Sequence, residues 1–224
     1  MRIHQTIRRI IGKAYEIIVI NVSKLFPQKG LIYMFHSVGD EHHEFNVSIN
    51  SFERFIESIK GSNIVRLEDY KKGNNFICLT FDDVADSFYY NAYPLLKKNK
   101  IPFTIFVSCD LLDREHYLST AMLKEVSECD LCTIGSHGWH HSYYTDLKTR
   151  EIEDELSSSR AKLEELTNKK VELFAFPFGS IYACGLWNRK YVKKYYRYGF
   201  GTISAPVSKV CLLPDYYLPR ICVN

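Results

Sequence analysis

The sequence predicts an α/β protein built as a closed or nearly closed β/α barrel, and two observations support this prediction. Seven apolar runs rich in β-branched and aromatic residues follow residue 30, and segments with helical spacing of apolar residues lie between them. Nearly continuous apolar strands that alternate with helices indicate a parallel sheet covered on its outside. Hydrophobic residues make up 46% of the 224 residues, which is enough for one domain with a substantial core.

Residues 1–28 are predicted to form a basic amphipathic helix ahead of the barrel, which would occupy residues 29–224. Isoleucines recur at roughly helical spacing from Ile3 to Ile18, and Glu16 interrupts the apolar run. The basic residues among them are Arg2, Arg8, Arg9 and Lys13. The apolar stretch is too short to span a bilayer, and no small-residue cleavage site follows it. We expect a helix that lies on a membrane surface or one that packs across the open end of the domain.

The remaining elements follow in chain order. The predicted strands are LIYMFHSV (31–38), NFICLTFDD (75–83), PFTIFVSC (102–109), CTIGSH (132–137), LFAFPFG (173–179), FGTISA (200–205) and YLPRICV (217–223). The first predicted helix carries Phe52, Phe55 and Ile59 on one face, with Asn50 or Ser51 as its N-cap and Glu53 completing a capping box. The other predicted helices cover residues 85–98, 118–126, 149–166 and 187–197.

Charge and cysteine content narrow the function classes. A net charge of +3, with no basic block beyond the N-terminus, gives no electrostatic footprint for nucleic-acid binding. Seven cysteines form no disulfide framework, and the lone CxxC of Cys129 and Cys132 lacks a second pair for a structural zinc site. Unpaired thiols in this number favour a reducing compartment, so we expect a cytoplasmic protein. If the N-terminal helix lies on a membrane surface, it would contact the inner face of that membrane.

Unusual polar residues fall at the ends of the predicted strands. His36 ends the first strand, Asp82 and Asp83 the second, and His137 the fourth. PFG (177–179) ends the fifth strand, and Arg220 lies on the seventh. The carboxyl ends of parallel barrel strands converge on one face, and that face carries the active site. Individually such residues are often ordinary turns, but their shared position predicts one site.

The residue types at this face suit a divalent metal. Asp83, His137 and His141 could occupy one side of the ion, with the histidines four apart on a helical turn. Asp82 would then be free to act as a general base. Zinc suits two imidazoles and a carboxylate best, although Co²⁺, Ni²⁺ and Fe²⁺ also fit.

Three motifs carry a family resemblance. LTFDDV, IGSHGWHH and FAFPFGS, in this order and spacing, resemble the motifs of the polysaccharide deacetylase family (NodB homology, carbohydrate esterase family four). The upstream YMFHSVG resembles the branch of the family whose first strand carries a histidine. The resemblance covers roughly residues 30–223. It implies a distorted (β/α)₇ barrel and metal-dependent removal of N-acetyl, or O-acetyl, groups from a sugar or polysaccharide.

The resemblance also implies roles for single residues. Asp82 matches the family's catalytic base, and the metal ligands match Asp83, His137 and His141. Pro177 and Phe178 fall in the motif that contacts substrate, where the Phe178 N–H would stabilise the oxyanion. The substrate implied is an N-acetylated glycan or sugar.

The chain departs from the family pattern at three positions. Val84 replaces a glycine, and a β-branched residue is strained if that position needs a positive φ. Ala175 replaces the arginine that orients the base, and Arg220 is our candidate substitute. The late histidine that supplies the general acid is absent, and His36 is best placed to replace it, unless it is a buried histidine bonded to backbone. A degenerate barrel that only binds glycan, and a metal-dependent amidase for a non-sugar substrate, therefore stay as alternatives.

Overall fold

Seven parallel strands form one curled sheet, which confirms the predicted fold class. The computed structural model describes residues 2–26, 29–39, 44–209 and 211–224. The strand order is β10-β1-β4-β5-β6-β7-β8, and every neighbouring pair is parallel. The strands are β1 (Lys29–Phe35), β4 (Phe76–Asp82), β5 (Phe103–Val107), β6 (Cys132–Ser136), β7 (Leu173–Ala175), β8 (Tyr198–Phe200) and β10 (Ile221–Cys222). All seven lie within or beside the runs predicted from the sequence.

The two edges of the curled sheet are joined by backbone hydrogen bonds outside regular strands. Leu218 donates to the carbonyl of Gly199 at 2.7 Å, and Gly201 donates to that of Leu218 at 2.8 Å. Arg220 donates to Ile203 at 3.1 Å. The chain before β10 therefore lies against the chain after β8 and brings the curled sheet round into a distorted barrel.

The last two strands are shorter than predicted, and each has a local reason. β8 ends at Phe200, because Gly201 and Thr202 donate to Leu218 and Gly179 instead of continuing along β7. β10 begins only at Ile221, after Pro219, which has no N–H for a strand ladder. Three further short strands were not predicted: β2 (Ser37–Val38) pairs with β3 (Asn46–Val47), and β9 (Val207–Ser208) pairs antiparallel with β1.

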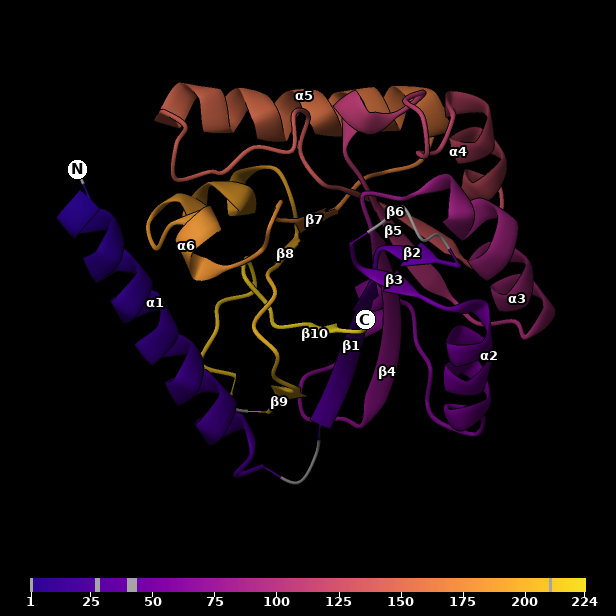
Figure 1. The fold of residues 1–224 in the computed structure, drawn as a ribbon, viewed down its shortest axis with the longest axis horizontal. Coiled ribbons are helices and arrows are strands. Elements are labelled where there is room, and N and C mark those ends of the chain that lie inside the picture. Colours follow the sequence, from indigo (N-terminus) through magenta and orange to yellow (C-terminus); the bar gives the residue numbers. More distant parts are fainter. Residues whose placement is uncertain (1, 27–28, 40–43, 210) are drawn as a thin grey trace.

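Helices cover the outside of the sheet (Figure 1). They are α2 (Ile49–Ser58), a π-helical turn (Phe88–Ala92) that runs into α3 (Tyr93–Lys98), α4 (Thr120–Ser127), α5 (Thr149–Thr167) and α6 (Ile181–Cys184). α5 buries Ile152, Leu156 and Leu163 and begins where Glu151 accepts the backbone N–H of Lys148 at 2.6 Å. It ends at Asn168, whose φ of 51° stops the helix.

Two predicted helices differ from the structure. The N-cap of α2 is Ser48, whose hydroxyl accepts the Ser51 N–H, so the predicted caps Asn50 and Ser51 lie inside the helix and Glu53 completes no capping box. The segment predicted as a helix over residues 187–197 is a 3₁₀ helix (Asn188–Lys194). Its buried residues Arg189 and Val192 are three apart, a spacing that a 3₁₀ helix places on one face.

The predicted N-terminal helix is present as α1 (Arg2–Ser23) and packs along one edge of the molecule beside α6 (Figure 1). Val19 is buried, Gly12 lies against Ile181, and the Tyr15 hydroxyl donates to the carbonyl of Leu212. None of the described helices is both long and apolar enough to cross a membrane. The predicted domain boundary at residue 28 lies outside the described residues.

Candidate active site

The ends of three strands bring the predicted site residues together. His36 follows β1, Asp82 ends β4 and Asp83 follows it, and His137 follows β6. Because these strands are parallel, their carboxyl ends meet at one end of the barrel. There a cavity of about 440 Å³ is lined by His36, Asp82, Asp83, His137, His141 and Phe178, among others.

Asp83, His137 and His141 place one ligand atom each within 4.8 Å of the others. The Oδ1 atom of Asp83 lies 3.1 Å from the Nε2 atom of His141 and 3.5 Å from that of His137. Neither approach has hydrogen-bond geometry, so this buried oxygen has no hydrogen-bond partner among the described residues. The three residues therefore face one another across a common point, as the prediction of a shared metal site requires.

The hydrogen bonding of His137 makes this arrangement suitable for a cation. Its Nδ1 atom lies 2.8 Å from the carbonyl oxygen of Ala175, which can only accept, so Nδ1 carries the proton. Burial lowers the pKa of His137, which keeps the imidazole neutral and leaves its Nε2 atom as an acceptor. Two acceptors, Nε2 and the Asp83 carboxylate, then face each other in a buried place. A divalent cation would satisfy both, and the Ala175 carbonyl would orient the ligand.

Asp83 and His141, the other two candidate ligands, influence each other's protonation. Burial alone would raise the pKa of Asp83, but the His141 side chain and the His137 imidazole lower it below its ordinary value. Burial also disfavours a charged His141, yet the neighbouring Asp83 carboxylate raises the pKa of that histidine. Asp83 is therefore ionised, and the raised pKa of His141 favours a proton on that ring beside the Asp83 carboxylate. A bound cation would displace this proton, and two imidazoles and one carboxylate would then form a donor set that suits zinc and similar metals.

The histidines reach this point by a different backbone path from the predicted one. Residues 137–141 form a bend and not a helical turn, with φ of 81° at Gly138 and 54° at His141. The strand end fixes His137, and the bend returns the chain so that the two imidazole rings lie 5.1 Å apart. The two histidines lie close enough to reach one ion, but through a bend and not through the helical turn considered from the sequence.

Arg220 holds Asp82 in place. Its Nη1 and Nη2 atoms each donate to one carboxylate oxygen of Asp82 at 2.6 Å, and both residues are buried. The guanidinium also donates to the Gly201 carbonyl and to the Thr80 hydroxyl, so its position is fixed. Burial alone would raise the pKa of Asp82, but Arg220 lowers it below its ordinary value. Arg220 thus contacts Asp82, the residue that it was predicted to orient, while Ala175 is buried on β7.

Phe178 lies at the cavity and Pro177 behind it. Phe178 has a φ of 59°, and its N–H donates to no atom of the described residues, so it is available to an oxyanion. Tyr143 stacks on its ring at 3.9 Å, a contact that the sequence did not indicate. Pro177 is buried beside Gly138 instead of at the cavity wall. The His36 side chain lines the cavity with its ring 4.9 Å from that of Phe45.

Backbone strain gathers at this site. Besides His141 and Phe178, the adjacent Asp83 and Val84 have φ of 58° and 56°. The sequence predicted strain at Val84 if this position needs a positive φ. It does, because Val84 is a buried β-branched residue in the left-handed region. Such strain persists where the surrounding structure fixes it and is typical of functional sites.

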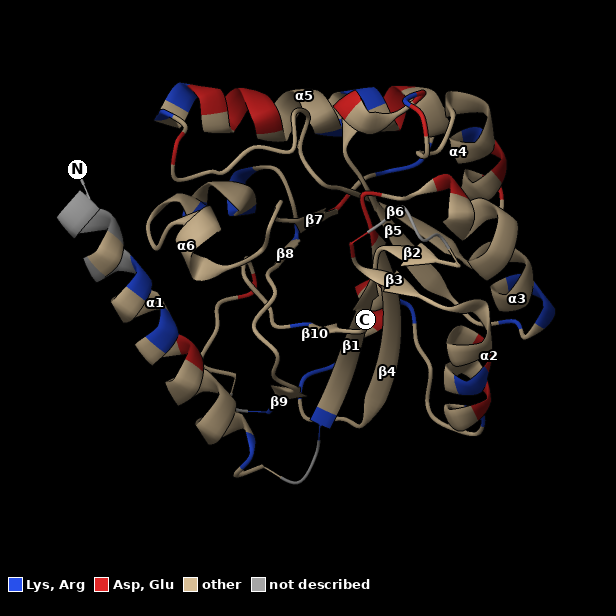
Figure 2. Ribbon diagram, viewed as in Figure 1, with Lys and Arg blue, Asp and Glu red and all other residues tan. Residues whose placement is uncertain are grey.

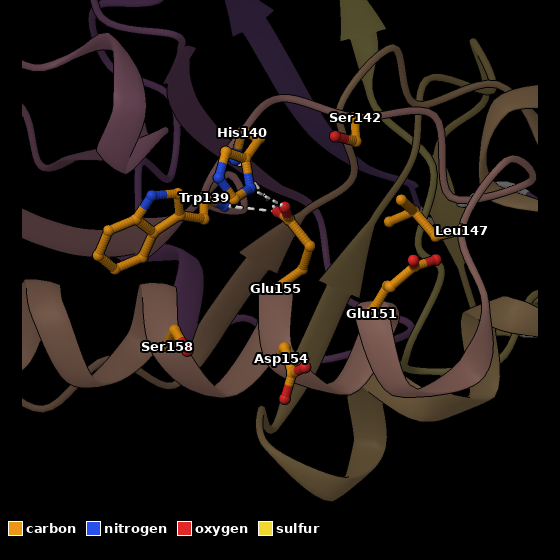
Figure 3. Close-up of a pocket in the computed structure, with 8 residues that line it drawn as sticks. All are labelled: Trp139, His140, Ser142, Leu147, Glu151, Asp154, Glu155 and Ser158. Carbon is orange, nitrogen blue, oxygen red and sulfur yellow. Dashed lines mark hydrogen bonds and ion pairs between the residues drawn. The ribbon is translucent and has the colours of Figure 1, made fainter.

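The sequence analysis missed Glu155, a buried residue of α5. Its carboxylate accepts the Trp139 N–H at 2.7 Å, the His140 N–H at 3.2 Å and a hydrogen bond from His140 Nδ1 at 2.5 Å (Figure 3). These donors lie between the two candidate ligands His137 and His141. The signal was an acidic residue on the apolar face of the helix, between Ile152 and Leu156. A cavity of about 580 Å³ lies on this outer side of the loop, away from the predicted catalytic residues.

Comparisons with known proteins agree with this geometry. Residues 69–203 match the family model described as polysaccharide deacetylase. The chain belongs to the polysaccharide deacetylase family. The match includes Asp82, Asp83, His137, His141 and Phe178, whereas His36 and Arg220 lie outside it.

Several family members have similar sequences or folds. The poly-β-1,6-N-acetyl-D-glucosamine N-deacetylase of Staphylococcus aureus is 29% identical over 215 residues, covering 86% of this chain and 72% of that protein. YxkH of Bacillus subtilis is 24% identical over 163 residues. The aligned segment covers 68% of this chain and 58% of YxkH. The crystal structure of a polysaccharide deacetylase from Bacillus cereus has a TM-score of 0.77 at 28% identity, covering 87% of this chain and 65% of that one. The Streptococcus pyogenes deacetylase PplD, at 20% identity and a TM-score of 0.77, shares the fold.

Proposed function

We propose that this protein is a metal-dependent hydrolase that removes N-acetyl groups from a sugar or polysaccharide. The observation that carries the proposal is the pairing of two functions in one cavity. Asp83, His137 and His141 each bring one possible ligand atom to a common point, and the carboxylate of Asp82, held by Arg220, lines the same cavity. A divalent metal, most simply zinc, would polarise the acetyl carbonyl and acidify the attacking water when bound.

The chain's own residues supply the proton transfers and the charge stabilisation. Asp82 is ionised and oriented by Arg220, so it can accept the proton of the attacking water. The backbone N–H of Phe178 can donate to the oxygen that becomes negative in the tetrahedral intermediate. When the C–N bond breaks, the departing amine needs a proton, and His36 at the cavity wall is our candidate donor.

The substrate we propose is an N-acetylated glycan. The name of the Staphylococcus aureus relative specifies poly-β-1,6-N-acetyl-D-glucosamine, so oligomers of that polymer are the first substrates to test. A barrel that binds glycan without turnover would have no need of an ionised carboxylate held beside a metal site. Acetate release measured against non-sugar amides would separate a sugar deacetylase from a general amidase.

The two adjacent aspartates test the proposal because their roles differ. We expect Asp83→Asn to lose the metal, since the amide is a weaker ligand than the carboxylate. Asp82→Asn should keep the metal and lose turnover, since only the base is removed. Metal content by mass spectrometry, acetate release and circular dichroism distinguish these outcomes. The roles are misassigned if both variants fold and lose metal equally, or if His137→Ala/His141→Ala keeps full metal occupancy.

His36 is tested separately because it lies outside the matched family segment. We expect His36→Ala to keep fold and metal and to lower the turnover of amide substrates by about 10²–10⁴-fold, the usual contribution of a positioned acid. An activated aryl ester, whose leaving group needs no proton, should be hydrolysed with much less loss. Amide turnover at the parent rate would show that another group supplies the proton.

A further inference from the structure

α1 presents an apolar face to solvent along the edge of the molecule. Ile10, Ile17 and Ile18 are 62%, 58% and 54% exposed, and Ile11 is also exposed. At 100° per residue these side chains lie within an arc of about 120° on one side of the helix. The opposite side carries Gly12 and Val19, which pack against the domain. The apolar face is therefore not the one that holds the helix to the fold.

Two residues after α6 extend this face. Leu186 and Trp187 line a cavity of about 540 Å³ together with Ile11 of α1. Trp187 is 79% exposed, the largest exposed fraction among the large hydrophobic side chains described. An exposed tryptophan at the border of an apolar surface is typical of the boundary between lipid and water, where its ring is amphipathic.

The charge along this face has one sign. Among the described side chains of residues 9–26, the exposed charged ones are Arg9, Lys13 and Lys24. At 100° per residue Arg9 and Lys13 lie on one flank of the apolar arc, with the Arg9 guanidinium 4.7 Å from the Tyr182 ring, and Lys24 follows the end of α1. The acidic residue of the helix, Glu16, is half-buried and lines a hollow together with Ser180 and Tyr182 of the domain. Figure 2 shows the basic residues along α1. The surface therefore combines exposed apolar side chains with a basic border.

We propose that this surface, formed by Ile10, Ile11, Ile17 and Ile18 of α1 with Leu186 and Trp187, docks onto an anionic lipid membrane. An amphipathic helix with basic residues beside its apolar face lies in the plane of the membrane, with the apolar side chains in the acyl boundary and the basic ones at the phosphates. A second copy of the chain fits less well, because an antiparallel two-fold contact through α1 would bring the basic flanks together. The proposal goes beyond the deacetylase activity, since lipid binding needs no turnover.

Vesicle binding of the full-length protein tests the proposal. We expect the protein to co-sediment with phosphatidylcholine vesicles that contain about one-third phosphatidylglycerol, more weakly as salt rises, and less with phosphatidylcholine alone. Ile10→Gln/Ile17→Gln/Ile18→Gln should lower the partition coefficient at least about tenfold. Lys13→Gln/Lys24→Gln should lower it about thirtyfold on anionic vesicles at low salt, a factor of about five for each lysine. Glutamine keeps good helix propensity, so circular dichroism should be unchanged.

A matched control and a second signal complete the test. Tyr90→Gln removes another large exposed side chain, 60% exposed, in the π-helical turn that precedes α3, and should bind vesicles like the parent protein. Trp187 fluorescence should shift to shorter wavelength on binding, and the shift should disappear in Trp187→Phe. Absence of binding, or equal binding by the triple variant and Tyr90→Gln, would overturn the proposal. A dimer in sedimentation equilibrium that the triple variant converts to monomer, without vesicle binding, would identify a self-association surface instead.

Discussion

At the scale of single residues, Arg220 and Asp82 form a buried ion pair. Its contribution to the free energy of unfolding depends on both partners being present. Each carboxylate oxygen accepts one guanidinium N–H at 2.6 Å, and the guanidinium is fully buried. Removing one partner of such a pair leaves the other charge buried and uncompensated. We therefore expect Arg220→Met to lower the free energy of unfolding by about 3–5 kcal/mol near neutral pH.

The pH dependence of Arg220→Met follows from the pKa of Asp82. With Arg220 that pKa is lowered, so Asp82 contributes stability at neutral pH that is lost as the pH falls through its folded pKa. Without Arg220 burial, the largest influence, raises the pKa and is opposed only by the weaker effects of His137 and His36. The contribution then reverses and stability decreases as the pH rises, while the acid limb of kcat/KM moves to higher pH. Urea unfolding and pH–rate profiles, with Arg220→Lys as an intermediate control, measure both effects. An unchanged acid limb in a folded Arg220→Met variant would argue against Asp82 as the base.

The sequence could predict which residues of the site come together, but not how the backbone delivers them. Asp82, Asp83 and His137 stand at strand ends, and the convergence of parallel strands places them at one face without further knowledge. The bend at residues 137–141 and the positive φ of Asp83 were beyond reach, because non-glycine residues adopt that region only where tertiary contacts impose it. Glu155 was missed because its role depends on a tertiary contact: it accepts backbone N–H groups of the loop that follows β6.

At the scale of elements, strong apolar periodicity predicted a long helix reliably, but the ends of short elements and their helix type were predicted poorly. α5 was placed within one residue of its observed end because its apolar residues repeat over five turns. The 3₁₀ helix and the π-helical turn before α3 were read as ordinary α-helices, since their apolar spacing is too short to distinguish the three types. The strand after Phe200 was overestimated because its residues pair across the barrel seam, a contact that local patterning does not contain.

Glu155 connects two elements, and its removal should weaken metal binding at the candidate metal site. It ties the loop that carries His137 and His141 to α5 through three hydrogen bonds. Partners that orient ligands typically contribute about 10–100-fold to metal affinity. We expect Glu155→Ala to weaken zinc binding by that factor. Glu155→Gln should weaken it less, since the amide oxygen still accepts the backbone N–H groups.

Chelator competition, which needs no substrate, measures this effect. Asp154→Asn is the matched control, because Asp154 is the exposed neighbour on α5 and lines the same outer cavity. It should bind zinc like the parent protein. Zinc affinity that is unchanged in a folded Glu155→Ala variant would show that β5 and β6 hold the loop without α5.

At the scale of the whole molecule, α1 is attached to the barrel without contributing to its cavity. The residues that line the cavity begin at Met34, whereas α1 ends at Ser23. Its contacts to the domain include the buried Val19, the Tyr15 hydroxyl bond to Leu212 and the Arg189 guanidinium 5.9 Å from the Tyr15 ring. The helix therefore supports stability and the proposed membrane surface, while the chemistry is built entirely from the rest of the chain.

A chain that begins at Lys29 should separate these contributions. We expect it to deacetylate soluble glycan oligomers at close to the parent rate, because every proposed site residue is retained. Its free energy of unfolding should fall by about 2–5 kcal/mol, since the burial of Val19 and part of Tyr15 is lost. Vesicle binding should be lost with the helix. Urea unfolding, acetate release and co-sedimentation measure the three effects independently. A shortened chain that folds normally and binds metal but releases no acetate would mean that α1 shapes the active site, and that the predicted boundary between helix and catalytic domain is wrong.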